Sequence, residues 1–187
     1  IDRSARTLLT IIDEILDLSK IEAGKLEVHP VPFNIEDCVQ SVVELMAPKA
    51  IEKGLELVWR VDADLPGSVV ADEIRVRQIL LNLIGNAIKF TDTGGVCVRV
   101  GFRALDDATG ALAQVRLEVE DTGIGIPAEQ IPTLFADFQQ AEEVVRRRRG
   151  GTGLGLAISR RLAQAMGGDI AVKRDPWPCR LLTAISP

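Results

Sequence analysis

The segment from residue 79 to residue 91 constrains the fold of this chain more than any other, and it reads ILLNLIGNAIKFT. A spacing of four places Asn82 and Asn86 on one face of a helix, one turn apart, and Lys89 falls near the same face. The opposite face is apolar and is predicted to be buried; it consists of Ile79, Leu80, Leu83, Ile84 and Ile88. The segment therefore predicts an amphipathic helix that presents two amides and one cation together.

That polar face has the chemistry of a magnesium–nucleotide site. Amide oxygens can coordinate a hard cation such as Mg²⁺, which prefers oxygen ligands. A neighbouring lysine offers a point charge to a phosphate. A helix whose polar face simply meets water would show the same pattern, so this motif alone leaves both interpretations open.

A glycine-containing turn follows a predicted strand further along the chain. Residues 115–120 alternate apolar and charged side chains with the period of a half-buried strand, and Asp121 stands at its end. A carboxylate there can accept a hydrogen bond from an exocyclic amine such as that of adenine. Gly123 and Gly125 would let a flat ring approach the main chain closely. An ordinary Asp-Thr-Gly turn is the alternative interpretation.

A second glycine-rich segment, GGTGLGLAIS at residues 150–159, leads into a predicted helix. Such a loop presents successive N–H groups and a helix N-terminus, which both favour phosphate. It lacks the spacing of a dinucleotide fingerprint and of a P-loop. The preceding loop carries four adjacent arginines at 146–149, which repel one another. We expect one or two of them to reach a triphosphate, the alternative being a solvated surface run.

Together and in this order, the three segments resemble the ATP-binding domain of sensor histidine kinases, within the gyrase-like (GHKL) ATPase superfamily. Residues 134–138, LFADF, resemble the phenylalanine box of that family, and Arg75 and Gln78 match the residues that precede its asparagine box. The similarity extends from about the start of the chain to Val172. It implies an α+β fold, a two-layer α/β sandwich of the Bergerat type, with a mixed sheet, three main helices on one face and an additional N-terminal helix.

The resemblance also implies roles for individual residues, and it implies no catalytic side chain within this chain. Magnesium would be coordinated by Asn86, with Asn82 as a second ligand or a support. Lys89 would contact a phosphate, and Phe90 would pack against the base or, equally well, within the core. Asp121 would bind the adenine amine directly or through water, with Gly123, Gly125 and Ile126 shaping the pocket. The lid and the phosphate-binding N–H groups would come from Gly151, Thr152, Gly153, Leu154 and Gly155.

Two differences from the hydrolysing and self-phosphorylating members limit the predicted activity. The hydrolysing members carry a water-activating glutamate where this chain has Asn82, and an amide is no base at neutral pH. The only histidine, His29, lies in a strand or linker context without the signature of a phosphoacceptor. The opening helix resembles the second helix of the dimerising hairpin. We therefore expect residues 1–25 to be part of that hairpin, and residues 26–187 to be the ATP-binding domain.

The expected function is to bind Mg²⁺-ATP and to donate its γ-phosphoryl group to a histidine outside this chain. The implied partners are the hairpin helix with that histidine and the receiver domain of a response regulator, with a homodimer in the full-length kinase. The alternatives are a non-catalytic module that senses nucleotide or binds a partner, and a gyrase-type ATPase, which Asn82 disfavours.

Composition fits one ordinary globular domain plus a short element, because the 187 residues are 47% hydrophobic and 26% charged. A net charge of −5 argues against a nucleic-acid surface. The sequence has no apolar run long enough to cross a bilayer, so we expect a cytoplasmic protein or the cytoplasmic part of a membrane-bound sensor. Three scattered cysteines, Cys38, Cys97 and Cys179, have no metal-binding or redox spacing.

Periodicity and breaker residues give a coarse order of elements. Helices are expected at 4–23, at 35–51 with Pro48 bending or ending it, from an N-cap at Asp72 onward, at 127–138 and at 152–166. Strands are expected at 26–33, 55–61, 69–71, 96–103, from 115, and at 170–172. After Val172 the chain departs from the family, because prolines flank Trp177 where a glycine turn is typical. Residues 181–185 could form a last strand, and the sequence leaves open whether the sheet is complete.

Overall fold

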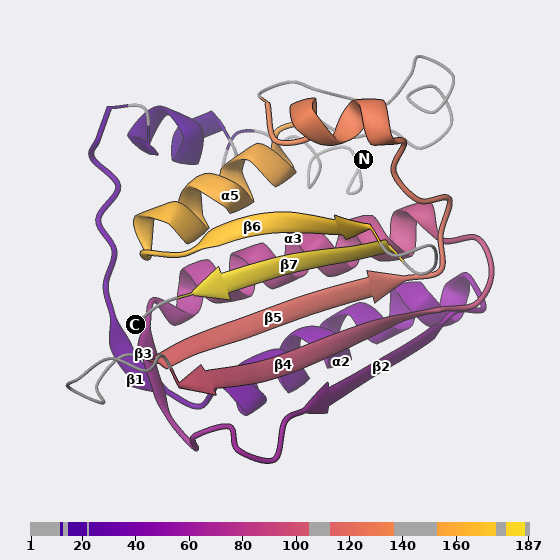
Figure 1. Ribbon diagram of the computed structural model, residues 1–187, viewed down its shortest axis with the longest axis horizontal. Coiled ribbons are helices and arrows are strands. Elements are labelled where there is room, and N and C mark those ends of the chain that lie inside the picture. Colours follow the sequence, from indigo (N-terminus) through magenta and orange to yellow (C-terminus); the bar gives the residue numbers. More distant parts are fainter. Residues whose placement is uncertain are drawn as a thin grey trace.

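The computed structural model describes residues 12, 15–21, 23–104, 113–136, 153–174 and 179–185. A five-stranded mixed sheet has three helices packed on one of its faces (Figure 1). The strand order is β2-β4-β5-β7-β6; β2 and β4 are parallel and every other neighbouring pair is antiparallel. The strands are β2 (Glu56–Val61), β4 (Gly95–Ala104), β5 (Ala113–Asp121), β6 (Asp169–Arg174) and β7 (Cys179–Ile185). This architecture confirms the predicted two-layer α+β sandwich.

The three covering helices begin close to the predicted positions, and α2 and α5 also end close to them. They are α2 (Ile35–Glu52), α3 (Glu73–Phe90) and α5 (Gly155–Ala165). As predicted, Asp72 caps α3, because its Oδ1 accepts a hydrogen bond from the backbone N of Arg75 at 3.1 Å. Helix α2 continues past Pro48 to Glu52, so the proline does not end it. Pro48 and Glu44, whose carbonyl loses its helical donor, are both exposed to water, which makes the loss tolerable.

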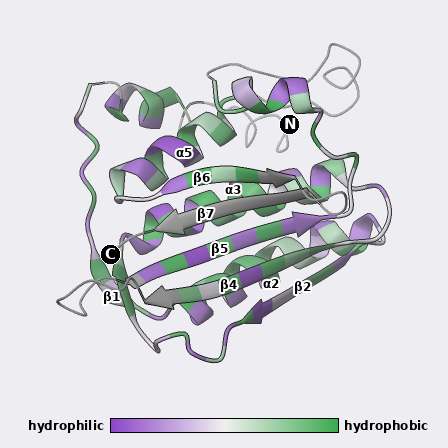
Figure 2. Ribbon diagram, in the orientation of Figure 1, coloured by the Kyte–Doolittle hydropathy of each residue, from purple (hydrophilic) through white to green (hydrophobic). Residues whose placement is uncertain are grey.

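The hydrophobic core lies between the sheet and these helices. The predicted apolar face of α3 is buried, with Ile79, Leu80, Leu83 and Ile84 at 0% exposure. Strand β5 meets this face with Val115, Leu117 and Val119, while Arg116 between them is exposed. Figure 2 shows the resulting bands of hydrophobic and hydrophilic residues along β5. Buried residues recur about every 3.6 positions along α3 and at every second position along β5. These two periods determine which face of each element packs against the other layer.

The C-terminal segment forms β7, which lies between two other strands of the sheet. Strand β7 pairs with β5 on one side and with β6 on the other, so it is an interior strand. The backbone of Thr183 lies opposite Leu117 of β5 and Ile170 of β6. The structure thus answers the question that the unusual C-terminal sequence had left open.

The N-terminal part is a helix followed by an extended connection. Residues 15–21 are helical, and Gly24 then turns the chain with a φ of 63°. The rest of the expected helix at 4–23 lies mostly outside the described residues. Only β1 (Val31–Phe33) is a strand, pairing antiparallel with β3 (Val69–Ala71), so the predicted strand at 26–33 was too long. Pro30 and Pro32 restrict the ladder hydrogen bonds that this segment can make.

Polar side chains attach the N-terminal helix to the start of α3. The carboxylate of Asp17 accepts hydrogen bonds from Gln78 Nε2 at 2.7 Å and from Arg75 Nη1 at 3.3 Å. The backbone N of His29 donates to Asp72 Oδ2 at 3.0 Å. Arg75 and Gln78, which match the residues that precede the asparagine box, therefore hold the N-terminal helix against the sandwich.

The remaining predicted elements differ in detail. The short helical stretch expected at 127–138 is a 3₁₀ helix, η1 (Ala128–Thr133), because Pro132 removes a donor within it. The residues at 106–110, whose Asp-Asp-Ala-Thr-Gly sequence predicts a hairpin loop, lie outside the described residues. Among the described helices, none combines the length and the apolar character that a membrane span requires.

Candidate functional site

The two asparagines of α3 form a chain of hydrogen bonds that reaches α5. Asn86 Nδ2 donates to Asn82 Oδ1 at 3.2 Å, and Asn82 Nδ2 donates to Ser159 Oγ at 2.8 Å. Both amides are half-buried, as their place on the edge of the apolar face requires. Within the described part of the chain, no donor reaches the carbonyl oxygen of Asn86. That oxygen is therefore available to a ligand.

The first turn of α5 lies against the same amides. A Cβ on Gly155 would collide with Asn82 Oδ1, so the Asn82 amide can hold its present position only beside a glycine. Leu154, 2% exposed, anchors the turn in the core, and Gly153 precedes it with a φ of 76°. In the described residues no side chain caps α5. The first N–H groups of a helix favour an anion.

The turn after β5 lies against the C-terminal end of α3. The backbone N of Ile124 donates to the carbonyl of Phe90 at 3.3 Å. A Cβ on Gly123 would lie 2.5 Å from that carbonyl oxygen and 2.7 Å from Asp121 Oδ1. Glycine is therefore required here for close approach. The turn carrying Asp121 therefore packs on the C-terminal end of the helix that carries the asparagines.

Thr122 fastens this turn to the loop between α3 and β4, a role that the sequence analysis missed. Its Oγ1 donates to the carbonyl of Thr93 at 2.9 Å and accepts from the backbone N of Gly95 at 3.0 Å. Threonine hydroxyls commonly bond nearby backbone groups in turns, so its position between Asp121 and Gly123 was an available signal.

The carboxyl group of Asp121 is held in place and partly desolvated. Its Oδ1 accepts a hydrogen bond from the backbone N of Gly123 at 2.9 Å. Burial raises the pKa of Asp121 above its ordinary value, while the hydrogen bond from Gly123 opposes that rise. A ligand amine that donates to this carboxylate would compensate for the water it has lost.

The end of α3 is capped by a lysine from elsewhere in the chain. Lys53, just after α2, donates from Nζ to the carbonyls of Ile88 and Thr91 at 2.8 Å and of Lys89 at 3.2 Å. A cation at the C-terminal end of a helix satisfies its last carbonyls. Sequence reasoning missed this contact because Lys53 and α3 are brought together only by the tertiary fold. The ammonium of Lys89 lies 4.9 Å from the centroid of the half-buried Phe90 ring.

The part of the phenylalanine box that is described packs on α5. The Arg160 guanidinium lies 4.9 Å from the centroid of the Phe135 ring. Arg160 also donates twice to the carboxylate of Asp169, at 2.9 and 3.1 Å, and this pair lowers the pKa of Asp169. Residues 137 and 138 of the predicted box lie outside the described residues.

The structure brings most of the predicted site residues together along α3. Asn82 contacts α5, and Phe90, eight residues or about 12 Å further along the helix, contacts the turn after β5. Gly125 in that turn has a φ of 72°, and Ile126 is half-buried. The described residues contain no cluster of three or more His, Cys, Asp or Glu side chains able to hold a metal. Gly151, Thr152 and the four arginines at 146–149 lie outside the described residues.

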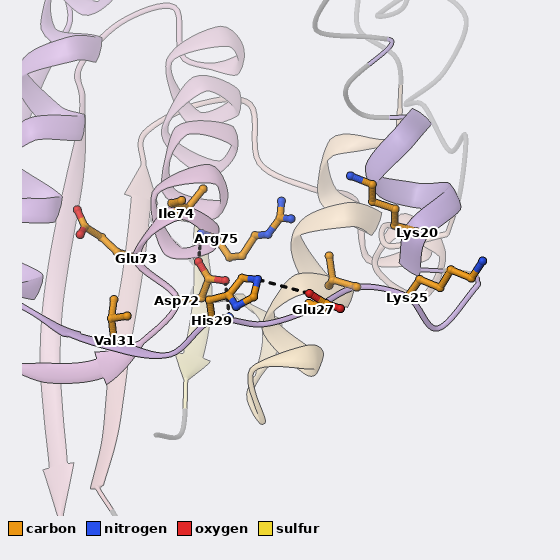
Figure 3. A pocket seen from close by; sticks show the side chains of 10 residues that line it. Lys20, Lys25, Glu27, His29, Val31, Asp72, Glu73, Ile74 and Arg75 are labelled. Atoms are coloured by element: carbon orange, nitrogen blue, oxygen red, sulfur yellow. Dashed lines mark hydrogen bonds and ion pairs between the residues drawn. The ribbon is translucent and has the colours of Figure 1, made fainter.

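A different hollow, of about 520 Å³, lies near the opposite end of α3 (Figure 3). It is bounded by the end of the N-terminal helix, by the extended connection and by the first turn of α3. His29 lies at its rim, exposed, with Nε2 3.8 Å from Glu27 Oε2. None of the residues that line this hollow is one of the predicted site residues.

Comparisons with known proteins support these observations. The model of the histidine kinase-, DNA gyrase B-, and HSP90-like ATPase family matches residues 71–180. Sensor protein GacS of Pseudomonas syringae pv. syringae is 49% identical over 94% of this chain and 19% of its own length. Signal transduction histidine-protein kinase BarA of Escherichia coli K12 is 45% identical over the same shares. The chain thus spans about a fifth of the length of these relatives.

A solved structure shows the same fold. Full-length ShkA, crystallised in complex with AMPPNP, has 37% sequence identity and a TM-score of 0.82, over 98% of this chain and 36% of ShkA. The family model, the relatives and this structure confirm the resemblance that the three motifs had indicated. The chain belongs to the histidine kinase-, DNA gyrase B-, and HSP90-like ATPase family.

Proposed function

We propose that this chain is the ATP-binding catalytic part of a sensor histidine kinase, which holds Mg²⁺-ATP and donates the γ-phosphoryl group to a histidine on another segment. The observation that supports this most strongly is the convergence on α3 of the amide pair, the Asp121 turn and the start of α5. The relatives' names as histidine kinases and the AMPPNP complex of ShkA support the same assignment. In this proposal residues 1–25 belong to the hairpin, and residues 26–187 form the catalytic domain.

The base would bind at the Asp121 end. The exocyclic amine of adenine would donate to Asp121, whose carboxylate the Gly123 N–H already orients at 2.9 Å. Gly123, Gly125 and Ile126 would form the adjoining wall, with main chain close to the ring. Phe90 would pack against the base from the end of α3, which Lys53 holds in place.

The phosphates would bind between α3 and the start of α5. Gly153, Leu154 and Gly155 would offer backbone N–H groups, and Gly151 and Thr152 would belong to the lid. Lys89 would contact a phosphate. Asn86 would coordinate Mg²⁺ through its carbonyl oxygen, with Asn82 as second ligand or support. Few protein ligands suffice, because Mg²⁺ is usually held by one or two protein oxygens, substrate phosphates and water. When bound, the ion would neutralise charge on the phosphates.

The site is suited to transfer rather than to hydrolysis. Asn82 stands where a water-activating glutamate would be, and its amide is already engaged with Ser159 and Asn86. An amide cannot take a proton from water at neutral pH. We therefore expect very slow ATP hydrolysis, and a turnover of several per minute by the pure protein would contradict this assignment.

The phosphoryl acceptor would be supplied by another polypeptide segment. His29 is exposed on an extended connection, and its backbone is tied to Asp72 at 3.0 Å, away from the amide pair. The partners would be a hairpin helix bearing the acceptor histidine, a receiver domain, and a second copy in the full-length kinase. The catalytic domain would act in the cytoplasm.

The decisive experiment has a binding arm and a transfer arm. A fluorescent ATP analogue is titrated with Mg²⁺ and with chelator, and γ-labelled ATP is then incubated with the protein and a purified histidine-containing hairpin domain. We expect Mg²⁺-dependent binding, acid-labile label on the hairpin domain and none on this chain. Binding without transfer would favour a nucleotide-sensing module, and label on this chain would overturn the assignment of an external acceptor.

A further inference from the structure

Ser159 is a buried polar side chain on the side of α5 that faces α3. It lies one turn after Gly155 and is 2% exposed. Its hydroxyl oxygen accepts the hydrogen bond from Asn82 Nδ2 at 2.8 Å, although the two residues are 77 positions apart. A buried hydroxyl is disfavoured unless it makes such a bond. Its interaction with the amide pair is therefore a specific feature of the α3–α5 contact.

The bond to Ser159 determines which way the Asn82 amide faces. An asparagine amide has one donor end and one acceptor end of nearly the same shape, so its hydrogen-bond partners decide its orientation. With Nδ2 directed at Ser159, Asn82 presents Oδ1 to Asn86, which donates to it at 3.2 Å. That second bond uses Nδ2 of Asn86. The carbonyl oxygen of Asn86 is thereby directed away from Asn82.

The direction of the Asn86 amide matters for the proposed site. Its carbonyl oxygen can coordinate a cation, whereas its NH₂ group is a donor and would repel one. Gly155 keeps the arrangement compact, because a Cβ there would collide with Asn82 Oδ1. The first turn of α5 would therefore supply N–H groups to the phosphates, and Ser159, one turn later, is the acceptor that fixes the amides.

We propose that Ser159 is a positioning residue: it orients Asn82 and, through it, directs the carbonyl oxygen of Asn86 toward the metal of the nucleotide complex. This inference rests on the proposed Mg²⁺-nucleotide site and adds a residue to it. Ser159 acts through Asn82 and Asn86, so its removal affects the metal-dependent part of binding. Removal of the Ser159 hydroxyl should leave the nucleotide contacts of Asp121 unchanged.

The test compares Ser159→Ala with Ser159→Thr and with a control, Ser41→Ala, in the full chain. Ser41 lies on α2, donates to the Cys38 carbonyl at 2.8 Å and accepts a hydrogen bond from Arg77 Nη1 of α3. Like Ser159 it bonds a side chain of α3, but that side chain is five residues before Asn82 and is not one of the amides. The dissociation constant of a fluorescent ATP analogue is measured with Mg²⁺ and with chelator. We expect Ser159→Ala to weaken binding about tenfold in Mg²⁺ and less than about twofold in chelator. Ser159→Thr should restore at least half of the loss, and Ser41→Ala should change neither value.

A second measurement needs no nucleotide. The side-chain amide signals of Asn82 and Asn86 in ¹⁵N-resolved NMR spectra report the two hydrogen bonds directly. Ser159→Ala should shift both pairs of signals and speed their exchange with water, and Ser41→Ala should do neither. If Ser159→Ala fails to fold, the same spectra of Ser159→Thr decide, because its hydroxyl should keep both pairs of signals in place.

Equal weakening with and without Mg²⁺, or unchanged Asn86 amide signals, would overturn the role of Ser159. The proposed function fails in a different way. In that case the parent protein itself shows no Mg²⁺-dependent binding of the analogue, while the amide signals still respond to Ser159→Ala.

Discussion

At the base end of the proposed site the neighbouring elements meet through main-chain groups, whereas at the phosphate end they meet through side-chain amides. Gly123 shows the first kind of contact, since the nearest obstacle to a Cβ is the Phe90 carbonyl oxygen at 2.5 Å. Gly155 shows the second, since the nearest obstacle is the terminal amide of Asn82. A backbone carbonyl in a helix cannot move without disturbing the helix, but an amide can rotate about its side-chain bonds.

The difference indicates that the two ends of the proposed site have different structural requirements. A base is flat and rigid, and the turn that Thr122 holds by two hydrogen bonds would present a fixed surface to it. Phosphates and their metal require charged and polar groups in the correct orientation, and the two linked asparagines would be oriented for them by their hydrogen bonds. Adding a side chain where main-chain groups meet at the base end should therefore damage the fold, and substitutions at the phosphate end should mainly damage metal-dependent binding.

The largest effect is expected for Gly123→Ala. The added methyl group would overlap the Phe90 carbonyl and the Asp121 carboxylate, so the turn must leave α3. We expect a loss of about 3 kcal/mol in the free energy of unfolding, within the range for overpacked sites, together with loss of nucleotide binding. Chemical denaturation checks the stability. Gly67→Ala is the control, because a Cβ there has nothing within 4 Å. If Gly123→Ala had the same free energy of unfolding as Gly67→Ala, the turn after β5 would be able to adjust to a side chain.

Asp121→Asn separates binding from stability at the same end. Loss of a charged hydrogen bond to the adenine amine should cost about 1.5–3 kcal/mol, roughly ten- to a hundredfold in affinity. The unliganded protein should become more stable near pH 7, because burial raises the pKa of Asp121 and the ionised form is therefore disfavoured in the folded state.

The pH dependence gives the sign of this stability effect. Below the ordinary aspartate pKa of about 3.9, the carboxyl is protonated in both states and carries no penalty. The penalty in the parent protein develops as pH rises through the raised folded pKa, so the advantage of Asn should grow over that interval and then level off. Thermal unfolding at several pH values measures it, with exposed Asp64→Asn as control. An unchanged dissociation constant would remove Asp121 from the base-binding site.

The sequence predicted those parts of the fold that depend on local pattern. The apolar face of α3, its cap at Asp72 and the strand before Asp121 follow from periodicity and capping chemistry, and the structure has all three. The family resemblance predicted that the amide pair, the Asp121 turn and the glycine segment belong to one site. In the structure the Asp121 turn contacts Phe90 and Gly155 contacts Asn82, both on α3, and the common site stays a prediction.

Contacts between distant segments were not predictable from one sequence. Lys53 caps α3 from 35 to 38 positions away, and Ser159 reaches Asn82 from 77 positions away. Neither residue belongs to a local pattern that indicates its partner. The interior place of β7 is similar, because its pairing with β5 and β6 depends on sheet order and not on the composition of residues 179–185.

Gly155→Ala should cause the smallest change in stability, and it is the sharpest test of the difference between the base end and the phosphate end. The added methyl group meets the amide of Asn82, which can swing away at the cost of its bonds to Ser159 and Asn86. Alanine also favours the helix over glycine by about 1 kcal/mol, so the free energy of unfolding should change by less than about 1 kcal/mol. Affinity for the ATP analogue in Mg²⁺ should fall about tenfold, as for loss of one or two hydrogen bonds. Gly85→Ala on α3 is the control, because its Cβ would make an ordinary 3.6 Å contact with Met46. If Gly155→Ala unfolds the protein as readily as Gly123→Ala does, the phosphate end is as rigid as the base end, and the proposed difference between them is wrong.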